Sequence, residues 1–205
     1  MKKLLFCLTG LLLMGTIAFS QPVHDNAVVP IGVTLNQILR LNILTGGNIE
    51  FVFTNIDQYE VGITGANYTT TFNVAASQDW DMEWDTDDAS LIGDIGIAAS
   101  NIELSNVGMY IECTGTHTTG GAAGASNMSI PFSSAGTVGD LSNGGEEIID
   151  ASTDHNGGDA QDNSFTIHWY CGTGTVDMTQ VSFIDQDYEP GRYSTNVLFS
   201  IKNHD

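Results

Sequence analysis

The sequence predicts an all-β protein, a two-sheet antiparallel β-sandwich with one disulfide and long polar loops. Three observations lead to this fold class. Apolar residues recur at every second position in several segments, which is the period of a strand with one buried face. Stretches rich in Gly, Asn, Asp and Thr separate these segments. Two cysteines also fall on the apolar faces of two different segments.

The first twenty residues, MKKLLFCLTGLLLMGTIAFS, have the pattern of a secretory signal peptide. Lys2 and Lys3 precede an apolar run, and Ala18 and Ser20 are small residues in front of a cleavage site at Gln21. A membrane anchor is the alternative, but the apolar run is short for a span of roughly 20 residues. We therefore expect export from a bacterial cell, to the cell surface, the medium or the periplasm, with no membrane insertion of the mature chain.

The chain that remains, residues 21–205, is strongly acidic. Arg40, Arg192 and Lys202 face 25 acidic residues, a formal charge of 3 − 25 = −22. Binding to phosphates needs clustered cations, so we expect no nucleic-acid partner. The length suits one domain, which we place at residues 32–205 behind an N-terminal extension or edge strand at residues 21–31.

The first half of this domain shows three alternating segments. In residues 33–43, VTLNQILRLNI, apolar side chains share one face except around Gln37 and Ile38, where a bulge or an edge position is expected. Gly46, Gly47 and Asn48 then form a turn signal, and residues 49–53, IEFVF, are expected to pair back as a hairpin strand. Residues 67–74, NYTTTFNV, alternate again.

Two later segments each end in a cysteine on the apolar face. They are residues 106–113, NVGMYIEC, and 164–171, SFTIHWYC. Because the inner faces of two stacked sheets meet, we expect a disulfide between Cys113 and Cys171. It would stabilise the fold by roughly 4 kcal/mol in the chain-entropy model. The alternative is two separate buried thiols.

An acidic strand with tryptophans follows the third segment. In residues 79–88, DWDMEWDTDD, carboxylates alternate with Trp80, Met82 and Trp84. We expect the tryptophans to pack inward and the acids to form a solvated row. The alternative is a Ca²⁺ site that uses Asp79 and Asp81, because Ca²⁺ prefers oxygen ligands. A platform of outward tryptophans that stacks on a sugar ranks last, since it would bury the carboxylates.

Residues 150–163, DASTDHNGGDAQDN, form a second acidic cluster. Its default interpretation is a solvated turn. Alternatively, oxygens of Asp154, Asn156, Asp159 and Asp162 bind Ca²⁺, although their spacing does not match an EF-hand loop.

No other cofactor is indicated. No histidine pair has a short metal-ligand spacing and no marked nucleophile motif occurs, so we expect no enzymatic activity; a hydrolase would need a pocket that gathers acids or a Ser-His pair.

The C-terminal stretch PGRYSTNVLFSIKN, residues 190–203, predicts a turn followed by a last core strand. It is similar to the closing strand of exported fimbrial and spore-coat-U-like subunits, which have Ig-like β-sandwich domains. The resemblance implies that residues 21–31 pair with the open sheet edge of a neighbouring copy. The anchors available are Val23, Val28, Val29 and Ile31. An unpaired terminus or an edge strand of the same domain are the alternatives.

From this resemblance and the composition we expect a non-enzymatic, secreted or cell-surface structural or adhesive protein, such as a self-assembling filament or matrix subunit. Its partners would be further copies of itself or other cell-surface proteins. The alternative function is a Ca²⁺-dependent carbohydrate-binding module with a glycan partner.

Overall fold

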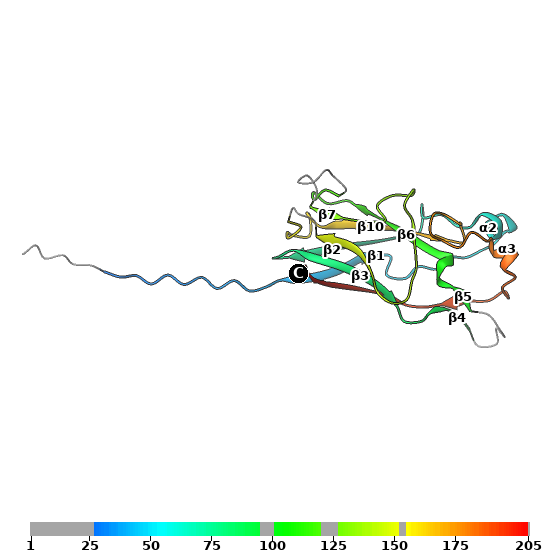
Figure 1. Ribbon diagram of the computed structural model, residues 1–205, viewed down its shortest axis with the longest axis horizontal. Helices are drawn as coiled ribbons and strands as arrows, with labels where there is room; N and C mark the ends of the chain where they lie inside the picture. The colour runs from blue at the N-terminus through cyan, green and yellow to red at the C-terminus, as the bar shows by residue number, and fades with distance from the viewer. Residues whose placement is uncertain (1–26, 95–100, 120–126, 152–154, 205) are drawn as a thin grey trace, which may run out of the picture. The chain divides into compact units, whose positions relative to one another are not determined.

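Antiparallel strands dominate the computed structural model, which describes residues 27–94, 101–119, 127–151 and 155–204 (Figure 1). The larger of its two compact units is Asn36–Asp205. In the described part of this unit, the first sheet has the order β1 (Leu39–Thr45), β2 (Thr69–Ala76), β10 (Ser164–Cys171), β6 (Val107–Cys113) and β8 (Gly139–Asp140). The second has the order β12 (Val197–Asn203), β3 (Trp80–Thr86), β9 (Glu146–Ala151) and β7 (Met128–Ser129).

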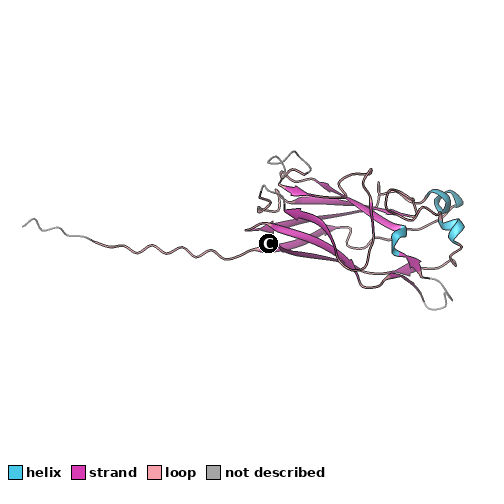
Figure 2. Cartoon of the chain, viewed as in Figure 1, coloured by secondary structure: helices cyan, strands magenta, loops and turns pink. Residues whose placement is uncertain are grey.

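Smaller elements lie beside these two sheets. A third, short sheet contains β11 (Tyr193–Ser194), β4 (Ser90–Gly93) and β5 (Ile102–Glu103). The helical segments α2 (Ile56–Val61), α3 (Phe183–Gln186) and η1 (Leu104–Asn106) gather at one end of the strands, and the C-terminus lies at the other end (Figure 2). All pairings between the named strands are antiparallel. The predicted all-β class with antiparallel sheets is therefore confirmed.

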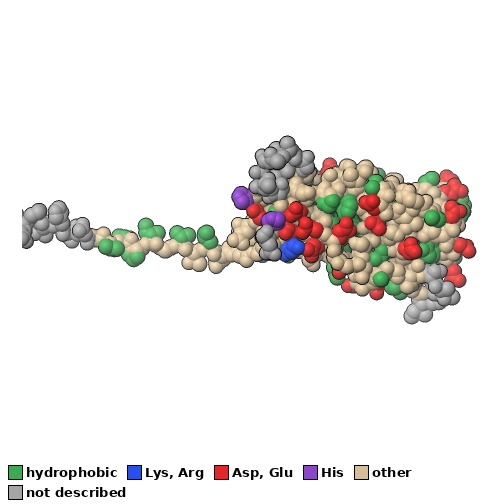
Figure 3. Space-filling view, in the orientation of Figure 1, with side chains coloured by type: hydrophobic (Ala, Val, Ile, Leu, Met, Phe, Trp, Pro, Cys, Tyr) green, Lys and Arg blue, Asp and Glu red, His purple; other side chains and the backbone are tan. Residues whose placement is uncertain are grey.

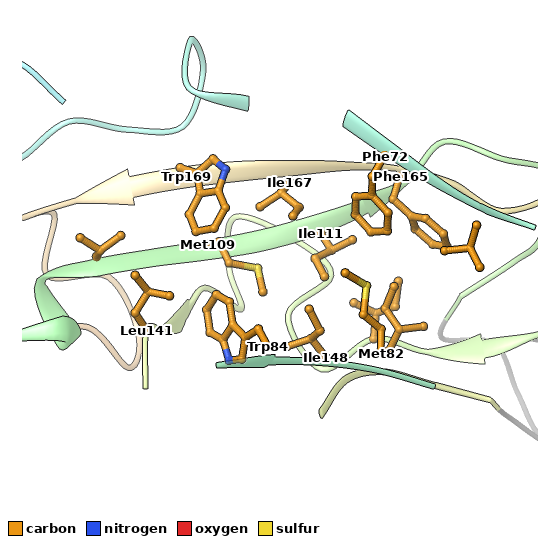
Figure 4. Packing of buried hydrophobic residues seen from close by; sticks show 14 of the residues in the cluster. Phe72, Met82, Trp84, Met109, Ile111, Leu141, Ile148, Phe165, Ile167 and Trp169 are labelled. Atoms are coloured by element: carbon orange, nitrogen blue, oxygen red, sulfur yellow. The ribbon is translucent and has the colours of Figure 1, made fainter. Parts of the chain in front are cut away.

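The two large sheets share one hydrophobic core. Side chains of β2, β6 and β10 point toward side chains of β3 and β9, as Figure 4 shows for Trp169 and Met109 opposite Trp84. Trp84 and Trp169 stack with ring centroids 6.5 Å apart. The period-2 pattern creates this core, because every second residue of β2 is buried. The predicted inward direction of Trp80, Met82 and Trp84 is confirmed, since all three are buried.

The predicted disulfide is wrong, because Cys113 and Cys171 are both free. The strands β6 and β10 are antiparallel neighbours in which Cys113 lies opposite Phe165 and Cys171 lies opposite Val107. Both cysteines close their own strands, so they lie six residues apart along the pair, or about 20 Å. A disulfide needs Cα atoms less than about 7 Å apart. Burial raises the pKa of the Cys171 thiol to about 12.

The predicted hairpin strand at residues 49–53 is also wrong, because this segment has no strand pairing. The partner of β1 is β2, in a register that joins Leu41 to Val74. At Gly46 the chain turns tightly against the start of β2, where Thr70 donates a hydrogen bond to the Gly46 carbonyl. A Cβ at Gly46 would lie 2.0 Å from the Thr69 carbonyl oxygen, so this turn requires glycine.

Candidate functional site

The smaller compact unit contributes an exposed apolar segment, residues 27–35. It has no secondary structure, and its side chains are exposed. Val29, Ile31, Val33 and Leu35 are 78–90% exposed and occur at every second position. In an extended chain these four side chains point to one side. An exposed row of large apolar side chains is typical of a surface that binds another protein.

The sequence predicted that the strand alternation starts at Val33, but β1 starts at Leu39. The register gives the reason, because Leu39 lies opposite Ala76, the last residue of β2. One further contact follows, in which the Ser77 backbone N–H donates to the Ile38 carbonyl. Before Ile38, the sheet offers no neighbouring strand in the described chain. The alternating pattern of a strand therefore begins at Val33, several residues before the first residue that has a partner in the sheet.

The strands β1 and β12 are the edges of the two large sheets, and they lie near each other. Gln37 donates a side-chain hydrogen bond to Asn203 between the ends of these strands. On its other side, β12 pairs with β3 over its whole length, from Val197 to Asn203. The opposite edges of the sheets are the two-residue strands β8 and β7. Among the described strands, the long open edges are thus on the β1 and β12 side.

The core is incompletely covered along these two edges. The core-facing side chains of β2 and β3, such as Phe72 and Met82, have no exposed surface. Those of β1 and β12, by contrast, are only partly buried: Leu39, Leu41, Val197, Phe199 and Ile201. An unpaired edge strand with apolar side chains is a template for pairing with a further strand.

Acidic side chains and histidines gather at the end of the larger unit where the C-terminus lies (Figure 3). Asp79 accepts hydrogen bonds there from the backbone N–H groups of Asn156 and Gly157. Its other oxygen is 2.6 Å from Nδ1 of His155. Burial raises the pKa of Asp79, but the hydrogen bonds from His155 and from the two backbone N–H groups outweigh it and lower the pKa overall.

Asp81 departs from the solvated row that the sequence predicted, because it is buried. The pairing of β3 with β9 ends at Met82 and Ile149, so Ala151 is not paired with a residue of β3. The Asp81 carboxylate accepts the backbone N–H of Ala151 at 2.9 Å. The same oxygen is 2.8 Å from Nδ1 of His204, and this hydrogen bond raises the pKa of His204.

Three predicted ligands of the second acidic cluster, Asn156, Asp159 and Asp162, accept hydrogen bonds within the protein. Oδ1 of Asn156 accepts the backbone N–H of Trp80. Oδ1 of Asp159 accepts the N–H groups of Gln161 and Asp162. Asp162 accepts a hydrogen bond from Thr116 and another from the Asp159 N–H. These bonds stabilise the loop itself.

Two predicted site residues, Asp154 and Val23, lie outside the described residues, as do residues 1–20. The structure brings Asp79 and Asp81 to one end of the sheets but does not group them with Asp159 and Asp162 as ligands. Calcium binding therefore stays a prediction. A sugar platform of Trp80 and Trp84 has no support, because both side chains are buried.

Sequence reasoning did not select Asp150, the first residue of the second acidic cluster, or His204 as ligands, although both meet Asp81 at the end of the sheets. The three residues come from segments far apart in the chain, so no short motif joins them. The position of His204 one residue after the last strand was the available signal, since it extends the strand by one hydrogen bond from its N–H to the Asp79 carbonyl.

Comparison with protein-family models and with curated proteins finds no match for this chain. Within the described residues, none of the helices has the length and apolar character needed to cross a membrane.

Proposed function

We propose that this protein is a non-enzymatic, exported structural or adhesive protein that assembles by adding a strand of one copy to the open sheet edge of another. The sheets would then form an Ig-like, fimbrial-like β-sandwich, as the resemblance of residues 190–203 implies. The observation that carries the proposal is the alternating exposed row Val29, Ile31, Val33 and Leu35. Of the predicted anchors, Val29 and Ile31 belong to this row. Val28 is also exposed but lies on the opposite side of the segment.

The backbone of residues 28–35 suits pairing on one side only. In a strand, successive residues direct their N–H and C=O groups to opposite sides. Pro30 has no N–H, so a strand that paired along the side shared by residues 28, 30, 32 and 34 would lack one ladder hydrogen bond. The opposite side, shared by residues 29, 31, 33 and 35, is complete. Strand addition to an edge needs one complete side, and the apolar side chains supply the register.

A second copy is a better acceptor than the edge of the same chain. To pair antiparallel with its own β1, the segment would have to reverse direction within residues 36–38. Those residues are held, because the Ile38 N–H donates to Ser77 Oγ at 2.9 Å and Gln37 contacts Asn203. The partly buried row of β1 and β12 in another copy offers apolar contacts for the incoming side chains.

The alternative function, a Ca²⁺-dependent carbohydrate-binding module, has less support. Oδ1 of Asn156, Oδ1 of Asp159 and both carboxylate oxygens of Asp162 already accept hydrogen bonds from the protein. Calcium binding can be tested by the melting temperature of the protein, because a ligand that binds only the folded state raises it. A rise in melting temperature with millimolar-range Ca²⁺ and a fall with chelator would favour it over assembly.

The test of assembly compares two charge insertions that differ only in side-chain direction. Ile31→Asp places a carboxylate in the exposed apolar row, and Thr34→Asp places one on the opposite side of the same segment. We expect the wild type and T34D to form large assemblies on size-exclusion chromatography and in negative-stain electron microscopy, and I31D to remain monomeric. A wild type that is monomeric, or an I31D variant that assembles like T34D, would contradict the proposal.

A further inference from the structure

Three potential ligand side chains meet at the end of β3, β9 and β12. One atom each of Asp81, Asp150 and His204 can be chosen so that all three lie within 4.8 Å of one another. Nδ1 of His204 is 2.8 Å from Oδ1 of Asp81 and 3.5 Å from Oδ1 of Asp150. None of these three residues belongs to the residues that the proposed assembly uses, so an inference about the group does not depend on that assembly.

The backbone fixes the positions of these three residues. Asp81 lies within β3, and Asp150 pairs with Ser129 between β9 and β7. His204 donates its backbone N–H to the Asp79 carbonyl at 3.0 Å, which continues the ladder between β12 and β3. A site whose ligands stand on paired strands is preorganised, because its formation requires only side-chain adjustment.

The charges of the group favour a divalent cation. Two carboxylates share one imidazole, so the group carries a charge of −2 when the imidazole is neutral. The side chain of Asp81 is only 5% exposed, and a buried carboxylate is unfavourable without a cationic or hydrogen-bonding partner. Its Oδ1 also accepts the Ala151 N–H at 2.9 Å, a backbone bond of the kind that orients metal ligands.

The donor atoms and their spacing select the class of ion. Bonds of about 2.0–2.2 Å to N and O ligands place neighbouring ligand atoms of a tetrahedral Zn²⁺ site about 3.4 Å apart. The observed separations of 2.8 and 3.5 Å bracket this value. Imidazole suits Zn²⁺ and its neighbours in the transition series, whereas Ca²⁺ prefers oxygen ligands alone.

We propose that Asp81, Asp150 and His204 form a binding site for a divalent transition-metal ion of the Zn²⁺ class, with a fourth ligand position open. The side chains of Asp150 and His204 are 43% and 38% exposed, so the ion can enter from solvent. The open position would hold water or a donor atom from another molecule. Because Asp81 lies in β3, Asp150 in β9 and His204 directly after β12, the bound ion ties the end of β12 to β3 and β9.

The experiment is a calorimetric titration of the purified chain, prepared without a polyhistidine tag and treated with chelator, with ZnCl₂ at neutral pH. The variants are His204→Gln and Asp150→Asn, both at exposed side chains. The matched control is His168→Gln, which removes an imidazole that pairs with one carboxylate, Glu112, at 3.1 Å elsewhere on the fold.

We expect one Zn²⁺ per chain, with affinity at least about tenfold weaker in H204Q and in D150N and unchanged in H168Q. A parallel melting experiment should show that Zn²⁺ raises the melting temperature of the wild type but not of H204Q. The proposal is overturned if the wild type shows no saturable binding, or if H204Q binds Zn²⁺ as the wild type does. Binding that is lost in His155→Gln and kept in H204Q would also overturn it, by placing the ion at Asp79.

Discussion

Asn156 shows how a single buried side chain replaces a missing strand neighbour. It lies opposite Trp80, the first residue of β3, beyond the point where β9 stops pairing. Its amide oxygen accepts the Trp80 N–H at 3.0 Å, and its amide nitrogen donates to the Trp80 carbonyl at 2.8 Å. This is the pair of bonds that an adjacent strand would make. The residue that the sequence offered as a calcium ligand thus has a structural role.

We expect Asn156→Ala to lower the free energy of unfolding by about 2–4 kcal/mol, because it leaves a buried N–H and a buried carbonyl of Trp80 without partners. The matched control is Asn196→Ala, at an exposed side chain that donates to Asp87 at 2.7 Å. This change should cost less than about 0.5 kcal/mol. Urea unfolding followed by tryptophan fluorescence measures both.

The same experiment distinguishes a structural role of Asn156 from a role in calcium coordination. A purely structural role predicts that the N156A deficit is equal with Ca²⁺ and with chelator. If the deficit disappeared in chelator, calcium coordination by Asn156 would be the better explanation. If N156A were as stable as N196A, the hydrogen bonds to Trp80 would not matter.

Side-chain direction was predictable from the sequence, but side-chain partners were not. Alternation alone gave the inward direction of Trp80, Met82 and Trp84, because a strand has only two faces. It also placed Asp81 on the face opposite to Trp80 and Met82, and this direction of the side chain is correct. Its burial could not be predicted, since it depends on where β9 leaves β3 and on His204, 123 residues away in sequence.

At the scale of elements, the last strand β12 shows the same alternation of partly buried and exposed side chains. Phe199 faces the core and packs near Trp169, with ring centroids 6.4 Å apart. Its neighbour Leu198 is an exposed hydrophobic residue on the other face. Although β12 is an edge strand, it pairs with β3 along seven residues. We therefore treat β12 as part of the fold rather than as a detachable tail.

Lysine substitutions at these adjacent positions should differ sharply. Phe199→Lys removes an aromatic side chain from the core and directs a charge toward it, so we expect a loss of about 2–3 kcal/mol in the free energy of unfolding. Leu198→Lys should change this free energy by less than about 0.5 kcal/mol. Chemical denaturation of the two variants measures the difference, and equal losses would mean that β12 does not have the register found here.

The sequence predicted which segments form strands better than it predicted which strands pair with each other. The segments that became β2, β6 and β10 each had uninterrupted alternation. Residues 49–53 had an apolar strand composition as well, yet Gly46 directs the chain across the start of β2 instead of into a hairpin. The disulfide failed for a related reason: the pattern gave the face on which each cysteine lies but not the end of the sheet at which its strand finishes.

For the whole molecule, the formal charge opposes the proposed assembly: it is −20 for the full chain and would be −22 if residues 1–20 were removed. Copies of one chain repel one another at low ionic strength, and the exposed apolar row must overcome that repulsion to reach an open edge. The segment itself, residues 27–35, contains no charged residue. Salt screens the repulsion between the larger units but leaves the apolar contacts in place, because the Debye length falls to about 10 Å at 0.1 M salt.

We therefore expect assembly to become faster and more complete as NaCl rises from about 10 mM to about 300 mM, measured by static light scattering at constant protein concentration. The I31D variant should remain monomeric over the same range, which separates strand addition from unspecific salting-out. Dissociation of the assemblies by added salt would contradict this expectation. It would show that attraction between Lys and Arg side chains of one copy and acids of another holds the copies together, in place of apolar contacts along the sheet edge.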